Sequence, residues 1–176
     1  MTAIVPRLLA PRTAAGLILL AAAATIAGAL VFEHVFGLSP CPLCLVQRYP
    51  YYLGISLALV TAFMPRRVAP TGLALIAVVF FVSAGLGVYH AGVEWGWWQG
   101  PTDCAGAPAP AAENVGDFLR QLETTRVVSC TEAAWRFLGL SLAGWNVAIS
   151  LALAGFAAAA MREGLAYGSS SVSQYR

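Results

Sequence analysis

Long apolar stretches alternate with short polar segments along this chain. The twenty residues from Thr13 to Phe32 carry no charge, nor do the twenty-five from Phe137 to Met161. Between them, Tyr49 to Met64 is uncharged, and Val68 to Val93 contains one histidine but no charged residue. Each stretch can cross about 30 Å of hydrocarbon as a helix, provided that the second begins near Cys44. We therefore expect an all-α membrane protein, a bundle of four transmembrane helices.

The polar segments set the boundaries within one integral membrane domain, 1–176. The expected spans cover about 13–36, 44–64, 69–91 and 136–161, and the outer loops about 37–43 and 92–135. The first span has an alternative interpretation as a cleaved signal peptide, but its apolar run exceeds the roughly 7–15 residues of such a segment. The tail, 164–176, is Ser-rich and is expected to be disordered.

Arginines indicate the orientation of the bundle, since all ten basic residues are Arg. With four spans, both termini and the loop at 65–70 share one side. The positive-inside rule makes that side cytoplasmic. The arginines expected there are Arg7, Arg12, Arg66, Arg67, Arg162 and Arg176.

Composition supports a membrane protein and excludes other classes. Hydrophobic residues make up 59% of the chain and charged residues 10%, against about 25% charged in a typical soluble domain. This balance excludes an ordinary soluble domain, a disordered chain and a nucleic-acid-binding protein. Membrane lipid is therefore an expected partner.

The four cysteines are the candidate chemical groups. Three of them fall in the two outer loops and Cys44 stands at the boundary between the first loop and the second span, although cysteine is at home in apolar interiors. An even number of cysteines on the outer side of a bacterial membrane fits two disulfides. Their avoidance of the spans therefore points to thiol chemistry on the outer side.

Cys41 and Cys44 form a Cys-x-x-Cys motif at the expected start of the second span. Such a short loop adds little stability as a structural disulfide, so a redox role explains it better. Pro42 suits a first helical turn, whose positive end favours a thiolate. On that helix Arg48 shares one face with both thiols, where it is a candidate to stabilise a thiolate or to bind the polar group of an apolar cofactor. The alternative is an arginine that reaches lipid phosphates.

Cys104 and Cys130 stand apart in the long outer loop, which is rich in Ala, Pro and acidic residues. Their pair is either a structural staple or an exchangeable disulfide, and the spacing leaves both open. Between them, Val115, Phe118, Leu119 and Leu122 follow a helical period. This loop is therefore expected to carry a short amphipathic helix, on the membrane surface or against the span ends.

These features together resemble the DsbB family, the quinone-linked disulfide-generating proteins of the bacterial inner membrane. The motif Cys-Pro-Leu-Cys-Leu-Val-Gln-Arg-Tyr stands at the head of the second span, and a second cysteine pair lies in the second outer loop. The resemblance covers roughly 13–161. It implies an enzyme that oxidises a periplasmic DsbA-type, thioredoxin-fold protein and passes the electrons to ubiquinone or menaquinone.

The resemblance also implies roles for single residues. Cys41 and Cys44 are expected to form the disulfide next to the quinone, with Cys44 as the thiolate that reacts with it and Arg48 holding the ring. Cys104 and Cys130 are expected to form the loop disulfide, which reduced DsbA attacks at Cys104. Cys130 then passes electrons to Cys41.

Two further residues are candidates to contact the quinone. Trp135 resembles a family position near the quinone, and its alternative is an interfacial tryptophan. His90, at the outer end of the third span, is a candidate to hydrogen-bond quinone or an interfacial histidine. Gln47 precedes Arg48 where some relatives carry an acid, which leaves the charge around Arg48 open.

Three other functions compete with this interpretation. A vitamin K epoxide reductase-like thiol/quinone enzyme usually has its active Cys-x-x-Cys after the loop pair, whereas here the order is reversed. A thiol metal-binding membrane protein is a different class, but neither of the two histidines is near a cysteine in the sequence. A scaffold with structural disulfides leaves Arg48 on the thiol face unexplained. We therefore expect metal ligands to be absent.

Overall fold

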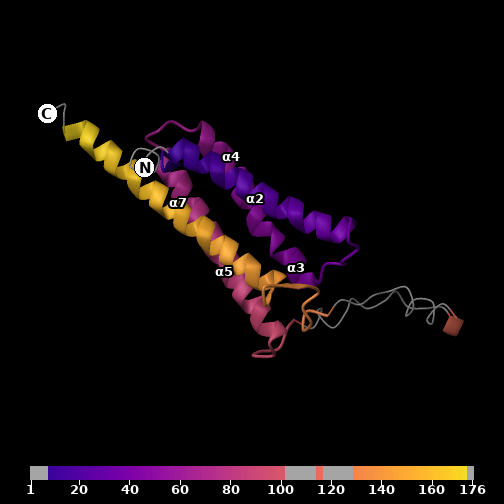
Figure 1. Cartoon of the computed structure of the whole chain (residues 1–176). Helices are drawn as coiled ribbons and strands as arrows, with labels where there is room; N and C mark the ends of the chain where they lie inside the picture. The colour runs from indigo at the N-terminus through magenta and orange to yellow at the C-terminus, as the bar shows by residue number, and fades with distance from the viewer. Residues whose placement is uncertain (1–7, 102–113, 117–128, 174–176) are drawn as a thin grey trace.

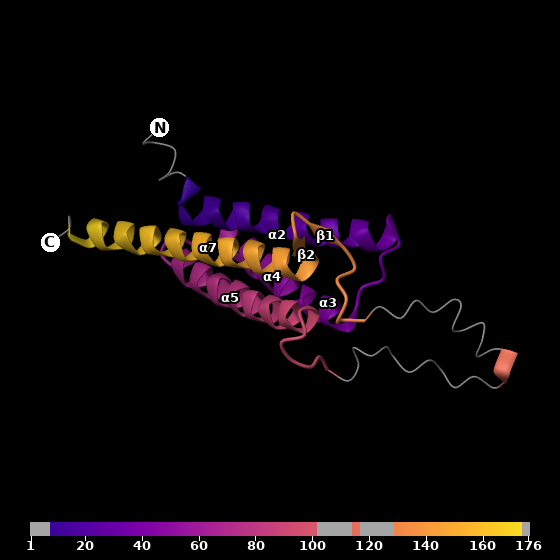
Figure 2. The ribbon, with the colours of Figure 1, turned by 60° about the horizontal axis from the view of Figure 1, so that its bottom comes forward.

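The fold is a bundle of long helices that run side by side (Figures 1 and 2). The computed structural model describes residues 8–101, 114–116 and 129–173. Its long helices are α2 (Pro11–His34), α4 (Arg48–Phe63), α5 (Ala69–Glu94) and α7 (Leu142–Ser173). The short helix α3 (Pro42–Val46) lies at one end of the bundle, so the Cys-x-x-Cys motif sits there.

Three helices of the described residues are long and apolar enough to cross a membrane: α2, α5 and the part of α7 from Leu142 to Ala166. The expected second span is different, because α4 has only 16 residues and would extend about 24 Å. It is separated from α3 at Gln47, so the two helices do not form one continuous helix from Pro42. Pro50 explains the break, since a proline cannot donate to the carbonyl four residues before it, here that of Val46.

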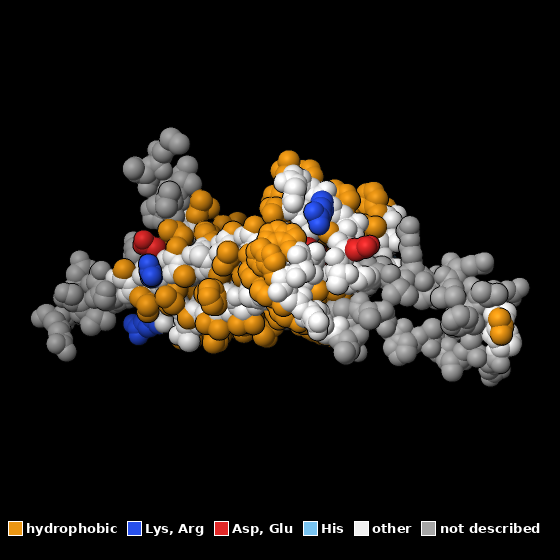
Figure 3. Space-filling model, turned by 90° about the horizontal axis from the view of Figure 1, so that it is seen from below, with side chains coloured by type: hydrophobic (Ala, Val, Ile, Leu, Met, Phe, Trp, Pro, Cys, Tyr) orange, Lys and Arg blue, Asp and Glu red, His pale blue; other side chains and the backbone are white. Residues whose placement is uncertain are grey.

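Apolar side chains are spread over the face of the bundle that Figure 3 shows, with few charged side chains between them. Among the large apolar side chains of the described residues, Phe63 and Phe81 have 80% and 69% of their surface exposed. A water-soluble protein does not leave such large side chains in contiguous patches, whereas lipid solvates them. Together with the long apolar helices, this surface indicates a membrane protein.

Small residues bring the helix backbones together in the interior. A Cβ on Gly87 of α5 would come within 2.8 Å of the Val147 side chain on α7. A Cβ on Gly54 of α4 would come within 2.7 Å of the Phe80 ring, which is fully buried. Close approach at small residues is the usual way in which membrane helices pack.

The last expected span begins later than its apolar sequence suggested. Residues 136–141 form an antiparallel hairpin of β1 (Arg136–Phe137) and β2 (Leu140–Ser141), so the helix starts at Leu142 rather than at 136. Leu138 and Gly139 turn the hairpin with φ of 51° and 80°, values typical of a two-residue type I′ turn. The Trp145 indole donates to the Phe137 carbonyl at 3.1 Å, which ties the hairpin to α7.

The chain end also differs from the expected disorder of 164–176, because α7 continues to Ser173. Gly164 lies in this continued part of α7. A Cβ there would meet Pro11 at 2.8 Å and Pro70 at 2.9 Å, so α7 packs against the starts of α2 and α5 at this point.

The start of α2, the turn between α4 and α5, and the later part of α7 gather at the end of the bundle opposite to α3. The Arg12 side chain donates to the Met64 carbonyl at 2.9 Å across this end. The amphipathic helix expected between Cys104 and Cys130 lies mostly outside the described residues.

Candidate functional site

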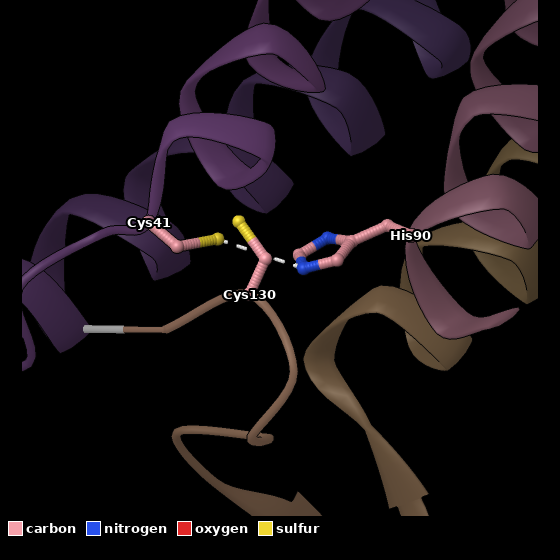
Figure 4. A group of neighbouring side chains, drawn as sticks. All are labelled: Cys41, His90 and Cys130. Carbon is pink, nitrogen blue, oxygen red and sulfur yellow. Dashed lines mark hydrogen bonds between the residues drawn. The ribbon is translucent and has the colours of Figure 1, made fainter. Parts of the chain in front are cut away.

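Three segments far apart in the sequence bring Cys41, His90 and Cys130 together (Figure 4). Cys41 precedes α3, His90 is one turn from the end of α5, and Cys130 lies on the loop before the hairpin. Their Sγ and ring nitrogen atoms lie within 4.8 Å of one another, and all three residues are buried. The structure therefore places the Cys-x-x-Cys motif directly against a cysteine of the long outer loop.

Cys41 and Cys44 are free cysteines whose Sγ atoms lie 2.6 Å apart. Cys41 is the N-cap of α3, and its Sγ accepts a hydrogen bond from the Cys44 backbone N–H at 3.2 Å. Pro42 begins α3, as the first-turn preference of proline predicts. Cys130, in contrast, is disulfide-bonded.

The environment of Cys41 favours its thiolate. The hydrogen bond from the Cys44 side chain lowers the pKa of Cys41 from 9.0 to about 5, against burial, which raises it. His90 adds to the lowering through a contact of 3.5 Å between its Nε2 and Cys41 Sγ. A thiol with a lowered pKa is a better leaving group in disulfide exchange, so this environment favours release of Cys41 from a bond with Cys130.

A chain of polar side chains continues from His90 into the bundle. Gln47 contacts His90 Nδ1 at 2.6 Å with its Nε2 and accepts from Asn146 Nδ2 at 2.6 Å with its Oε1. Asn146 Oδ1 accepts from the Tyr51 hydroxyl at 2.8 Å and from Ser150 at 3.2 Å. Buried polar groups that satisfy one another in this way specify a single arrangement of the core.

Arg48 forms an ion pair with Glu33 of α2 at 2.7 Å. The two side chains are 13% and 26% exposed, so the pair is partly desolvated. Glu33 comes directly after the uncharged run of the first span, and its pairing with Arg48 was not anticipated from the sequence. An acidic residue next to the end of an apolar span was the available signal.

A cavity of about 430 Å³ opens beside these groups, a volume within the usual range for a small-molecule site. Most of its wall is apolar, and its polar lining residues include Cys44, Arg48 and His90. The aromatic side chains that line it are Phe32, Tyr51, Trp135, Phe137 and Trp145. Such a site suits a flat, mostly apolar molecule with a few polar atoms.

The structure places both remaining candidates at this cavity. Trp135 lines it, packs against Phe32 with a centroid distance of 5.1 Å and stacks on Phe137 at 5.6 Å. His90 lines it too and is only 3% exposed, so its ring is enclosed by protein. Its Nε2 also lies 3.9 Å from Glu94, whose side chain is 4% exposed.

The structure brings a histidine next to the cysteines, which the sequence alone did not reveal. Cys41, His90 and Cys130 are close enough to be considered as metal ligands. However, thiolates rather than disulfide sulfurs bind metals, and Cys130 is disulfide-bonded. The cluster as it stands is therefore better suited to disulfide exchange than to metal binding. Cys104 lies outside the described residues.

Comparison with known proteins agrees with this geometry. The family model "Disulfide bond formation protein DsbB" matches residues 11–160. The chain belongs to the DsbB family. It is 36% identical to disulfide bond formation protein B of Marinobacter nauticus over 139 residues, which cover 74% of this chain and 80% of that protein. No solved structure matched the chain.

Other relatives extend the comparison. Disulfide bond formation protein B of Stutzerimonas stutzeri is 35% identical over 149 residues, 80% of this chain and 88% of that protein. An uncharacterized protein of Rickettsia prowazekii, RP370, is 30% identical over 126 residues, 71% of this chain and 73% of that protein. This DsbB-family chain is thus a membrane oxidoreductase of disulfide bond formation.

Proposed function

We propose that this DsbB-family protein oxidises a DsbA-type thioredoxin-fold protein and passes the two electrons to a membrane quinone. The observation that carries the proposal is the position of Cys41. Its Sγ faces Cys130 on the loop side and lies 2.6 Å from the sulfur of Cys44, which lines the cavity. One cysteine thus links a loop disulfide to a site for an apolar molecule.

The exchange begins at the loop pair, which we assign to Cys104 and Cys130. A thiolate of the reduced partner attacks Cys104, breaks the S–S bond and releases Cys130 as a thiolate. The Cys130 thiolate attacks Sγ of Cys41 in an oxidised Cys41–Cys44 pair, so that a Cys41–Cys130 bond forms and Cys44 leaves as a thiolate. The second partner thiol then displaces Cys104, and the partner ends with a new disulfide.

The last exchange step leaves both electrons on Cys41 and Cys44, which are then both reduced. The freed Cys104 thiolate attacks Cys130, restores the loop disulfide and releases Cys41. The structure has this distribution, with Cys130 disulfide-bonded and both Cys41 and Cys44 free. A hydrogen bond from His90 and one from the Cys44 backbone stabilise the charge on Cys41.

The cavity would suit a quinone, since its aromatic and apolar wall matches the ring and tail, and Cys44, Arg48 and His90 are among its polar lining residues. Arg48 and His90 would face the ring oxygens, and Trp135 would pack beside the ring. When bound, a quinone would supply an acceptor for two electrons and two protons, so that Cys41 and Cys44 return to a disulfide.

The orientation that fits this function places the cysteines in the periplasm and both termini in the cytoplasm of the bacterial inner membrane. Arg12, Arg66 and Arg67 belong to segments that gather at the end opposite to Cys41. This distribution agrees with the positive-inside rule. α3 and α4 together would form the remaining crossing, which makes four.

The test is turnover of purified protein with a reduced DsbA-type donor and a soluble ubiquinone or menaquinone analogue, followed by quinone absorbance. We expect loss of quinone to match loss of donor thiols, and Cys44→Ala to abolish both. Ser56→Ala is a control, because Ser56 is exposed and donates only to the Tyr52 carbonyl of its own helix. Absence of turnover with either quinone, in protein with all four cysteines, would refute the proposal.

A further inference from the structure

The polar chain behind Cys41 determines where the proton on His90 sits. The His90 ring has two nitrogens, and each faces a different kind of neighbour. Nε2 faces two acceptors, Cys41 Sγ at 3.5 Å and a Glu94 carboxylate oxygen at 3.9 Å. Nδ1 faces the Gln47 side-chain amide at 2.6 Å. A nitrogen between two acceptors carries the proton, and the other nitrogen of a neutral ring must then accept.

The side chain of Gln47 is oriented by its second neighbour. Because Nδ1 of His90 accepts, Gln47 must present its NH₂ group there and its carbonyl oxygen to Asn146. Asn146 in turn presents its NH₂ group to Gln47 at 2.6 Å, which leaves its oxygen for the Tyr51 and Ser150 hydroxyls. Rotating one amide alone would place two acceptors or two donors face to face.

Burial makes this arrangement costly to break. Gln47 is 9% exposed, and the residues at the far end of the chain, Tyr51 and Ser150, are 2% and 0% exposed. Asn146 is half-buried, and both amides line the cavity, so an amide that loses its partner is left partly desolvated. The two amides hold each other in one orientation.

We propose that Gln47 and Asn146 are positioning residues that hold His90 as its Nε2–H tautomer with the proton directed at Cys41. The inference rests on the proposed exchange between Cys41 and Cys130, in which this proton stabilises the Cys41 thiolate. Neither amide touches a reacting sulfur, and both act through the His90 ring. The other groups near Nε2 are Glu94, which attracts the same proton, and the disulfide of Cys130, which does not titrate.

The direct test is ¹⁵N NMR of protein labelled at histidine. The chain has only two histidines, so His34→Gln assigns the remaining signal to His90. His34 is exposed, and its one side-chain hydrogen bond among the described residues is with the Leu30 carbonyl of its own helix. We expect His90 to show a protonated Nε2 and an unprotonated Nδ1 near neutral pH. A His90 signal with Nδ1 protonated and Nε2 unprotonated would overturn the proposal.

Variants then separate positioning from a structural role. Gln47→Leu and Asn146→Leu should each give a mixture of the two His90 tautomers. Alkylation of Cys41 at pH 6 should then slow about tenfold, because the hydrogen bond from His90 to the Cys41 thiolate is lost or misdirected. Gln47→Glu should place a proton on Nδ1, because a carboxylate can only accept. Ser56→Ala, on an exposed part of α4, should change neither signal nor rate.

An unchanged His90 spectrum in folded Gln47→Leu and Gln47→Glu proteins would refute the proposal. Helical content by circular dichroism establishes folding, and Gln47→Glu keeps the size of the side chain if Gln47→Leu fails to fold. The spectrum needs neither partner nor quinone. A failure of this inference is therefore distinguishable from a failure of the electron transfer proposed above.

Discussion

Nε2 of His90 lies 3.5 Å from Sγ of Cys41, although the two residues are 49 positions apart in the chain. The contact joins the end of α5 to the start of α3 and is buried. It places the imidazole between the nucleophilic sulfur, the cavity and the carboxylate of Glu94. The reactivity of the Cys-x-x-Cys motif therefore depends on a helix that the motif does not belong to.

The lowered pKa of Cys41 predicts an unusual pH profile for its alkylation. An ordinary cysteine, with a pKa of 9.0, is almost fully protonated at pH 6, whereas Cys41, at about 5, is mostly thiolate. The rate at Cys41 should therefore stay near its plateau from pH 8 to pH 6 and fall only as the pH drops through about 5. Iodoacetamide labelling followed by peptide mass spectrometry measures this rate for Cys41 alone.

His90→Phe provides the comparison, because it keeps a ring but removes the donor to Cys41. The midpoint of the profile should move to higher pH in that variant. A profile that is centred near pH 9 in the unaltered protein would contradict the assignment of Cys41 as the stabilised thiolate.

The ion pair of Arg48 and Glu33 predicts unequal effects of its two partners on quinone use. Arg48→Met removes the charge at the cavity and should raise the quinone KM about tenfold or more, as expected for a lost charge-assisted hydrogen bond. Glu33→Gln keeps the guanidinium and should change KM less than about threefold. Steady-state assays at varied quinone concentration measure both. Equal effects would mean that Arg48 acts only through the ion pair.

Trp135 is expected to contribute to quinone binding by packing beside the ring. Replacing it with Ala removes an aromatic wall of the cavity and should raise the quinone KM roughly 2- to 10-fold, with a smaller change in kcat. Trp97→Ala is the matched control, because Trp97 is 65% exposed and does not line that cavity. If both variants raise KM equally, the effect is a general one on the outer end of the bundle.

Two glycines of α5 should respond differently to the same substitution. Gly87→Ala places a methyl group 2.8 Å from Val147 and 3.3 Å from a backbone oxygen of α7, so the helices must separate. The cost should be about 1–3 kcal/mol of stability. Gly85 has no atom within 4 Å of the added methyl, and Gly85→Ala should be neutral or slightly stabilising. Thermal unfolding in detergent compares them, and equal midpoints would contradict this packing.

Hydropathy and cysteine spacing along the chain were enough to predict a membrane protein and its chemically active groups. Uninterrupted apolar runs predicted the helices from Pro11 to His34 and from Ala69 to Glu94 to within a few residues. This works because a lipid-exposed helix must be apolar along its whole length. Cys41 and Cys44 were identifiable because their spacing is itself the signal, and the family resemblance named the rest.

How these groups come together became visible in the packed bundle. The break at Gln47 and the hairpin before Leu142 interrupt apolar sequence, so hydropathy could not reveal them. The pairing of Glu33 with Arg48 and the chain from His90 through Gln47 to Asn146 join separate helices. Such contacts depend on helix packing and side-chain direction, which no local pattern encodes. The sequence therefore supplied the sulfurs, and the packing of the bundle supplied the environment that makes one of them reactive.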